Sequence, residues 1–242
     1  FQAISPGGLS LASDNEYQSA VAATRIFSQS GIGDHNASTL KKLLTGKQVS
    51  LRTYLRETEE GISGRASTAD LETLMQLLHL SFTGIRADED VFTLWKERTT
   101  SAVKNRDLRP QRLFNEELQA FSNNYHERSL PLTLERLQSV DLKKAYAFLQ
   151  QRFADAGDFT FIFVGNIDLN QMKNLSERYL ASLPTQQGQE SWRDVGKTRP
   201  DGNQTFDLAK GSDPKSSVRI TYHGDAAWSV TAEEDLALLD AV

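Results

Sequence analysis

The sequence has no cysteine and only four histidines among its 242 residues. The absence of cysteine excludes disulfides, thiolate zinc sites and a cysteine nucleophile. It leaves the compartment open, because cytoplasmic proteins and exported proteins without disulfides both fit. No apolar run approaches the ~20 residues that span a bilayer, so we expect no insertion into a membrane.

The histidines are too widely spaced to suggest a local metal site. Zinc peptidase motifs such as H-x-x-E-H place two histidines within one turn of a helix, and no such pair occurs among His35, His79, His126 and His223. There is no G-x-S-x-G motif and no glycine-rich phosphate loop either. We therefore predict no catalytic residue and no metal ligand, and the residues that contact a substrate stay unknown.

Charge and composition are ordinary for a globular protein. The net charge is −5, with 38 % hydrophobic and 24 % charged residues, which does not favour nucleic acid as a partner. The acidic residues Glu57, Glu59 and Glu60 could form a site, but a solvated turn explains them with fewer assumptions. A second acidic run, from Asp88 to Asp90, suits the start of a helix.

The most apolar stretch, residues 159–168, reads Phe-Thr-Phe-Ile-Phe-Val-Gly-Asn-Ile-Asp. Both parities of this run are apolar, which is typical of a strand covered on both faces. We therefore expect a central strand over residues 159–164, with Phe161 and Ile162 on opposite faces. Asp168 should then cap a helix up to about Leu180.

Helical and strand patterns alternate along the rest of the chain. Strands are expected at residues 1–4 and 49–55, with a returning hairpin strand at 61–66 and further strands near 206–208 and 218–222. Helices are expected near residues 16–29, 38–44, 71–82, 91–103, 110–121, 142–153 and 233–242. Ser38 or Asn36 should begin the second of these helices. Thr231 should cap the last one, which is lined by Leu236, Leu239 and Val242. This order predicts an α+β fold, with a mostly antiparallel sheet and helices packed on one face.

Composition also suggests domain limits. Residues 1–184 should form one domain, residues 185–203 a polar linker, and residues 204–242 the start of a following homologous domain. The chain begins without methionine and ends inside an apparent helix, so we expect it to be a piece of a longer polypeptide.

Several short segments resemble the pitrilysin/insulinase family of zinc metallopeptidases, specifically the non-catalytic C-terminal half of bacterial two-lobed members. The resemblance covers residues 1–184 well and the remainder weakly, and it rests on the order and spacing of the segments. These segments are residues 5–10 (SPGGLS), 30–33 (SGIG), 44–47 (LTGK), 61–64 (GISG), 70–72 (DLE), 82–86 (FTGIR), 104–105 (KN), 158–168 (DFTFIFVGNID) and 179–184 (YLASLP).

The resemblance implies that the parent protein is a protease, and thus a hydrolase, with zinc in its catalytic half. It implies no cofactor in this chain. Catalytic members carry H-x-x-E-H on an early helix, whereas the comparable stretch here, residues 21–28, reads Val-Ala-Ala-Thr-Arg-Ile-Phe-Ser. The implied partners are the catalytic half of the same polypeptide and a peptide or unfolded-protein substrate. Bacterial members of this kind are often exported, so the implied location is the periplasm, with the cytoplasm as the alternative.

Two functional hypotheses follow. In the first, the chain is a non-catalytic domain that forms part of the wall of a peptide-substrate chamber in a zinc metalloendopeptidase. In the second, it is a free-standing scaffold or processing-subunit-like protein of the same fold without protease activity.

Overall fold

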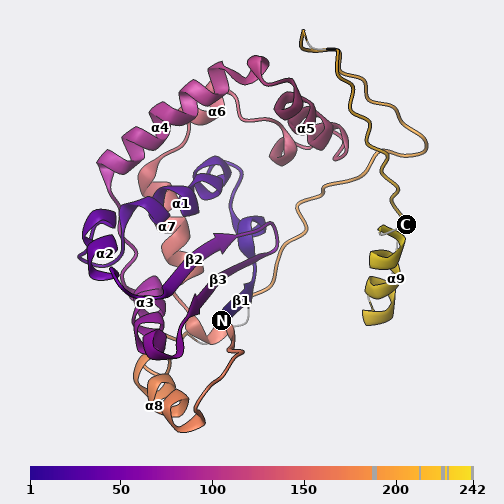
Figure 1. Cartoon of the computed structure of the whole chain (residues 1–242). Coiled ribbons are helices and arrows are strands. Elements are labelled where there is room, and N and C mark those ends of the chain that lie inside the picture. The colour runs from indigo at the N-terminus through magenta and orange to yellow at the C-terminus, as the bar shows by residue number, and fades with distance from the viewer. Residues whose placement is uncertain (187–189, 213, 225–226, 228, 241–242) are drawn as a thin grey trace. The chain divides into compact units, whose positions relative to one another are not determined.

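The computed structural model describes all residues except 187–189, 213, 225–226, 228 and 241–242 (Figure 1). Contacts divide the chain into two compact units, Phe1–Lys210 and Gly211–Val242. The first unit contains the sheet and most of the helices. Among the described residues, no helix has both the length and the apolar character that a membrane span requires.

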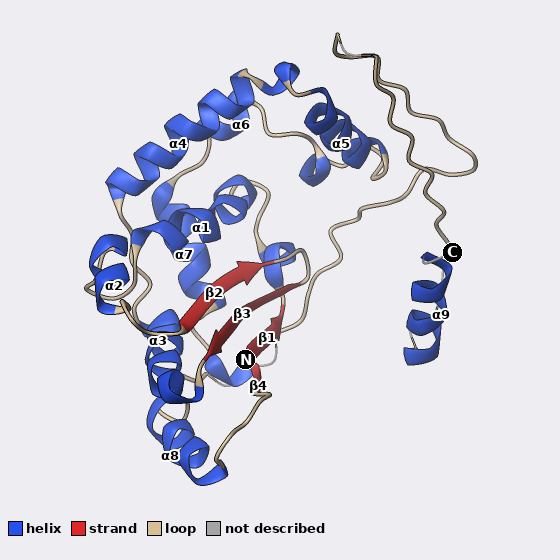
Figure 2. Ribbon diagram, in the orientation of Figure 1, coloured by secondary structure: helices blue, strands red, loops and turns tan. Residues whose placement is uncertain are grey.

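Four strands form one antiparallel sheet in the order β2-β3-β1-β4. The strands are β1 (Gln2–Pro6), β2 (Val49–Leu55), β3 (Glu59–Ala66) and β4 (Thr160–Ile162). The hairpin of β2 and β3 lies where the alternating pattern predicted it. An antiparallel sheet combined with helices confirms the α+β prediction (Figure 2).

The register separates the two faces of the sheet. Residues directly opposite each other in an antiparallel pair point to the same face, so Thr53, Ile62, Ala3 and Phe161 form one row across the four strands. Ala3 and Ile62 are fully buried, so this row belongs to the face that packs against the helices. The opposite face carries the row Arg52, Ser63, Gln2 and Ile162.

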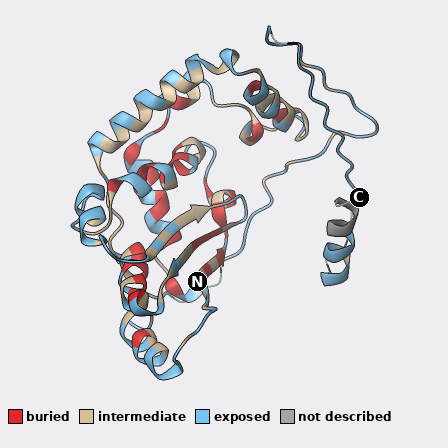
Figure 3. Cartoon of the chain, in the orientation of Figure 1, coloured by how far each residue is buried: buried red, intermediate tan, exposed pale blue. Residues whose placement is uncertain are grey.

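Helices α1, α3 and α7 supply much of the core, and buried residues gather where they meet the sheet (Figure 3). Their apolar stripes follow the helical repeat, as expected for helices that cover one face of a sheet. The helices of this unit are α1 (Tyr17–Ser30), α2 (Ala37–Leu43), α3 (Leu71–Thr83), α4 (Glu89–Lys104), α5 (Pro110–Phe121), α6 (Leu134–Gln138), α7 (Leu142–Arg152) and α8 (Leu169–Tyr179).

Local capping signals place the starts of α2 and α8 correctly. The Asp168 carboxylate accepts a hydrogen bond from the Gln171 amide at 2.8 Å. The Asn36 side chain likewise accepts from the Thr39 amide at 2.9 Å. Each side chain satisfies an amide that has no partner inside its own helix.

The prediction of a central strand at residues 159–164 is wrong. Strand β4 covers only Thr160–Ile162 and lies at an edge of the sheet. Phe159 is buried, but Ile162 is 43 % and Val164 86 % exposed. No described residues cover the outer face of this strand. The apolar side chains of Ile162 and Val164 are therefore exposed to solvent and not buried in a core.

The expected strands at residues 206–208 and 218–222 are also absent from the structure, which has no regular secondary structure there. Phe206, in the first unit, packs its ring 5.8 Å from Phe114 and 5.4 Å from Phe121, measured between ring centroids. Val218, Ile220 and Tyr222, in the second unit, are exposed. A segment with an alternating pattern forms a stable strand only when neighbouring strands supply backbone hydrogen bonds.

The second unit contains helix α9 (Val230–Asp240). Its start differs from the prediction, because the Ser229 hydroxyl, not Thr231, accepts a hydrogen bond from the Ala232 amide at 3.0 Å. The side chains of Leu236, Leu239 and Val242, which were expected to share one face, lie outside the described residues.

Candidate functional site

Helix α1 contains residues 21–28, the stretch that was compared above with the zinc-binding helix of catalytic family members. Ala22, Ala23 and Ile26 are buried in the core. Small and aliphatic side chains there pack the helix against α7 and β2 and offer no atom that binds a metal. Among the described residues, no group of three or more His, Asp or Glu side chains could hold a metal ion.

The structure does not bring the histidines together. His79 contacts the carbonyl oxygen of Tyr179 at 3.0 Å through Nδ1. His126 contacts the carbonyl oxygen of Val195 at 3.0 Å through Nε2. His35 and His223 are exposed, and His223 belongs to the second unit. Their positions match structural or solvated roles.

The interpretation of Glu60 as part of a solvated turn is wrong. Glu60 belongs to β3, its side chain is fully buried, and it shares the core face with Ser5 and Leu55. Its Oε2 accepts a hydrogen bond from the Gly8 amide, while Oε1 has no hydrogen-bond partner in the described part of the chain. Burial raises the pKa of Glu60 to about 7, against the opposing effects of the Gly8 hydrogen bond and Arg152.

Arg152 connects Glu60 to the segment that follows α8. Its Nη1 lies 3.6 Å from Glu60 Oε1 and 2.5 Å from Glu190 Oε2, and its Nη2 donates to Glu190 Oε1 at 3.0 Å. The arginine is almost completely buried, and its charge is compensated by Glu190 together with Glu60 when Glu60 is ionised. These three side chains connect the sheet, α7 and the later segment, and only the Glu190 side chain, which is 37 % exposed, reaches solvent.

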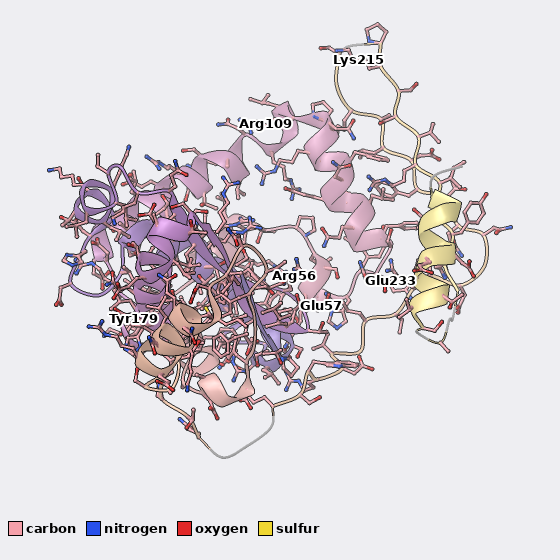
Figure 4. All side chains as sticks on the ribbon, turned by 60° about the horizontal axis from the view of Figure 1, so that its bottom comes forward. Arg56, Glu57, Arg109, Tyr179, Lys215 and Glu233 are labelled. Carbon is pink, nitrogen blue, oxygen red and sulfur yellow. The ribbon has the colours of Figure 1, made fainter. Side chains whose placement is uncertain are left out.

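Further contacts hold the same later segment to the first unit. The Arg193 amide donates to Ser10 Oγ at 2.9 Å, and Lys197 forms an ion pair with Glu57. Glu57 lies beside Arg56 at the tip of the β2–β3 hairpin (Figure 4). Residues 190–199 therefore run along the domain with specific polar contacts.

The outer face of the sheet is polar and aromatic. The Arg52 Nε donates to Ser63 Oγ at 3.0 Å. Tyr54 lies over Gly61, where an added Cβ would come within 2.4 Å of the tyrosine oxygen. The guanidinium carbon of Arg56 is 5.0 Å from the centroid of the Tyr54 ring. This face offers hydrogen-bond donors and one aromatic surface, which suits contact with polypeptide of varied sequence.

A cavity of about 630 Å³ lies beside β2, a size typical of ligand pockets. Exposed residues such as Lys41 and Arg52 are in its lining, so it opens to solvent. Its apolar lining comes from α1, α2, α3 and α7, together with Ile85 after α3. The apolar and aromatic members are Phe27, Ile32, Leu40, Leu44, Leu51, Leu77, Ile85, Leu149 and Phe153.

The four consecutive residues 50–53 of β2 all line this cavity. Successive side chains of a strand point to opposite faces. A cavity that touches both parities must therefore lie along the edge of the strand. β2 is an edge strand of the sheet, so the cavity borders backbone groups that no neighbouring strand occupies.

Sequence reasoning missed Glu60, Arg152 and the β2 cavity. The burial of Glu60 could have been inferred from its position two residues before Ile62 in the same strand, because side chains two residues apart point to the same face of a sheet. No local signal marked the cavity, because its lining is gathered from five separate elements.

The fold is that of an α+β domain, with a four-stranded antiparallel sheet and helices packed on one face. Residues 139–242 match the family described as "Peptidase M16 inactive domain". The chain is 25 % identical over 232 residues to a "Probable zinc protease PqqL" of Haemophilus influenzae, covering 94 % of this chain and 24 % of that protein. It is 24 % identical to a protein of the same description from Escherichia coli, covering 89 % of this chain and 23 % of that protein.

Solved structures agree on the fold. The periplasmic protease PqqL from Escherichia coli superposes with a TM-score of 0.69 at 21 % identity, over 81 % of this chain and 22 % of that one. A peptidase M16 inactive domain from Pseudomonas fluorescens superposes with a TM-score of 0.59 at 15 % identity, over 79 % of this chain and 48 % of that one.

These findings confirm the resemblance: the chain is similar to PqqL-like zinc proteases, and its residues 139–242 match the M16 inactive domain. The chain spans about a quarter of the length of these two PqqL relatives.

Proposed function

We propose that this domain is a catalytically silent part of the wall of the peptide-substrate chamber in a zinc metalloendopeptidase. In this proposal the zinc belongs to a catalytic half of the same polypeptide, and that half is the domain's main partner. The substrate is a peptide or an unfolded protein. The match to an inactive peptidase domain and the similarity to zinc proteases support the assignment.

The observation that carries the proposal is the uncovered outer face of the sheet. Helices bury one face, whereas the other carries Arg52, Tyr54 and Arg65, with no covering helix among the described residues. A sheet needs only one packed face for stability, so the second is available as a surface. Its donors and aromatic ring can contact a peptide backbone without selecting one sequence.

Two further parts of the proposal concern the cellular compartment of the parent protein and the domain boundaries of this chain. The Escherichia coli relative is described as periplasmic, which supports an exported parent protein. We also propose that the domain proper comprises residues 1–184, that residues 185–203 are a surface connector, and that residues 204–242 begin a following homologous domain.

The test is photo-crosslinking in the full polypeptide that contains this chain. A photoreactive phenylalanine replaces Arg65 on the outer face of the sheet or, as the control, the exposed Lys143 on α7. The general base of the zinc half is inactivated so that a bound peptide stays intact. We expect crosslinks to a peptide substrate from position 65 and few from position 143.

Equal labelling from both positions, or labelling only from position 143, would contradict the chamber-wall proposal. The same outcome would favour the alternative, a scaffold that acts through its helical surface.

A further inference from the structure

The edge of β2 has unpaired backbone groups that point toward the cavity. The Arg56 amide donates to the Glu59 carbonyl at 2.8 Å, and the Ser67 amide donates to the Gln48 carbonyl at 2.9 Å. These two bonds fix the even-numbered residues of β2 as those that face β3, because bonded pairs alternate along an antiparallel ladder. The N–H and C=O groups of Leu51 and Thr53 therefore point away from β3, and no hydrogen bond to them occurs within the described residues.

The wall facing this edge is a helix with an unfilled apolar side. No residue of α2 is buried, yet Leu40 and the C-cap residue Leu44 line the same cavity as β2. A short helix whose leucines face a cavity gains stability when apolar groups fill that space.

The charged residues that line the cavity are all basic, although Asp88, which lies outside the lining, places its Oδ2 3.6 Å from Arg86 Nη2. Lys41, Arg52 and Arg86 are in its lining, and no acidic residue is, although the chain as a whole has a net charge of −5. The Nε of Arg86 is buried without a hydrogen-bond partner in the described part of the chain. A carboxylate or carbonyl oxygen in the cavity would supply the hydrogen-bond acceptor that this guanidinium N–H group lacks.

We propose that the β2 edge takes up an extended, acidic segment of a peptide substrate as an added strand. The peptide backbone pairs with the free groups of Leu51 and Thr53, one apolar side chain enters between β2 and α2, and an acidic side chain reaches Arg86. Main-chain pairing supplies affinity and the cavity supplies selectivity, as in other strand-addition sites. This inference deepens the proposed function by naming a peptide class and a binding edge.

The test measures binding to the 242-residue chain by fluorescence anisotropy. The probe is a labelled peptide of about nine residues that alternates valine with serine and carries two glutamates. Two matched probes accompany it, one with lysines in place of the glutamates and one N-methylated at alternate residues so that it cannot pair. We expect saturable binding of the acidic probe below about 1 mM, and markedly weaker binding of both matched probes.

Paired variants of the chain locate the site. Thr53→Pro removes one edge N–H that the β2–β3 ladder does not use, so the sheet should tolerate it, and affinity should fall roughly three- to tenfold. Leu40→Glu places a charge in the apolar wall and should weaken binding about tenfold or more. Its control is Leu43→Glu on the same helix, where the leucine is already 56 % exposed and lies outside the cavity lining.

The arginine has its own pair. Arg86→Gln should weaken the acidic probe about threefold or more and leave the lysine probe unchanged, whereas Arg98→Gln on the exposed side of α4 should change neither. Circular dichroism confirms that each variant is folded before its affinity is interpreted.

Several results would overturn the inference: no saturable binding up to about 1 mM, equal affinity for the N-methylated probe, or equal losses in Leu40→Glu and Leu43→Glu. Light scattering that shows a dimer abolished by Leu40→Glu would assign the edge to a second copy instead. Because the assay uses the chain alone, its failure leaves the chamber-wall proposal, which the crosslinking tests in the full polypeptide, standing.

Discussion

The buried carboxyl of Glu60 makes the stability of the domain depend on pH in a defined direction. Burial raises its pKa in the folded state from 4.5 to about 7. Between these values the folded protein holds a proton that the unfolded chain has released. The free energy of unfolding contributed by this group is therefore largest below about pH 4.5 and is lost as the pH rises to about 7.

The expected magnitude follows from the size of the shift. Each pKa unit corresponds to about 1.4 kcal/mol, so the change from 4.5 to about 7 amounts to at most about 3 kcal/mol. Glu60→Gln removes the titration while its amide oxygen can still accept from the Gly8 amide, and Glu190 remains beside Arg152. The wild type should therefore lose stability relative to this variant as the pH rises, and the difference should level off above pH 7.

Urea unfolding of both proteins from about pH 4.5 to about pH 8 measures this difference. Glu59→Gln is the control, because Glu59 pairs with Arg56 at the surface and such pairs contribute less than about 1 kcal/mol. A wild-type stability that is constant relative to Glu60→Gln, or that rises with pH, would refute the reasoning about Glu60.

Three other predictions test the fold and the expectation that this chain binds no zinc. Gly61→Ala should lower the free energy of unfolding by about 1–3 kcal/mol, since a Cβ would meet both the Ala3 carbonyl oxygen and Tyr54 Oη at 2.4 Å; a variant as stable as wild type in urea would contradict this packing. Phe159→Ala should cost about 3–5 kcal/mol and Ile162→Ala distinctly less, because Phe159 is 7 % and Ile162 43 % exposed; equal losses would restore the idea of a strand covered on both faces. The chain purified without chelators should contain no stoichiometric zinc by elemental analysis, and one tightly held zinc per chain would reopen the catalytic interpretation.

Local patterns were sufficient for most of the first unit. Helical spacing of apolar residues and capping side chains such as Asn36 and Asp168 act within one turn, so the sequence alone locates them. The hairpin of β2 and β3 is equally local. The order of these elements, together with the family resemblance, was enough for the fold class.

Non-local features were not predictable in the same way. Whether both faces of residues 159–164 are covered depends on which other elements pack there, and the pattern of one strand cannot decide it. Glu60 looked solvated because its neighbours Glu57 and Glu59 are charged, while its compensating Arg152 lies on a distant helix. The β2 cavity depends on where α2 lies, which no motif encodes.

The most direct test of the central claim compares proteolysis by the isolated chain and by the full polypeptide that contains it. We expect that the isolated chain cleaves no peptide, because no group of the described residues could hold a water-activating metal, and that the full polypeptide shows chelator-sensitive cleavage. Chelator-sensitive proteolysis that follows the isolated chain through two purification columns would contradict the account.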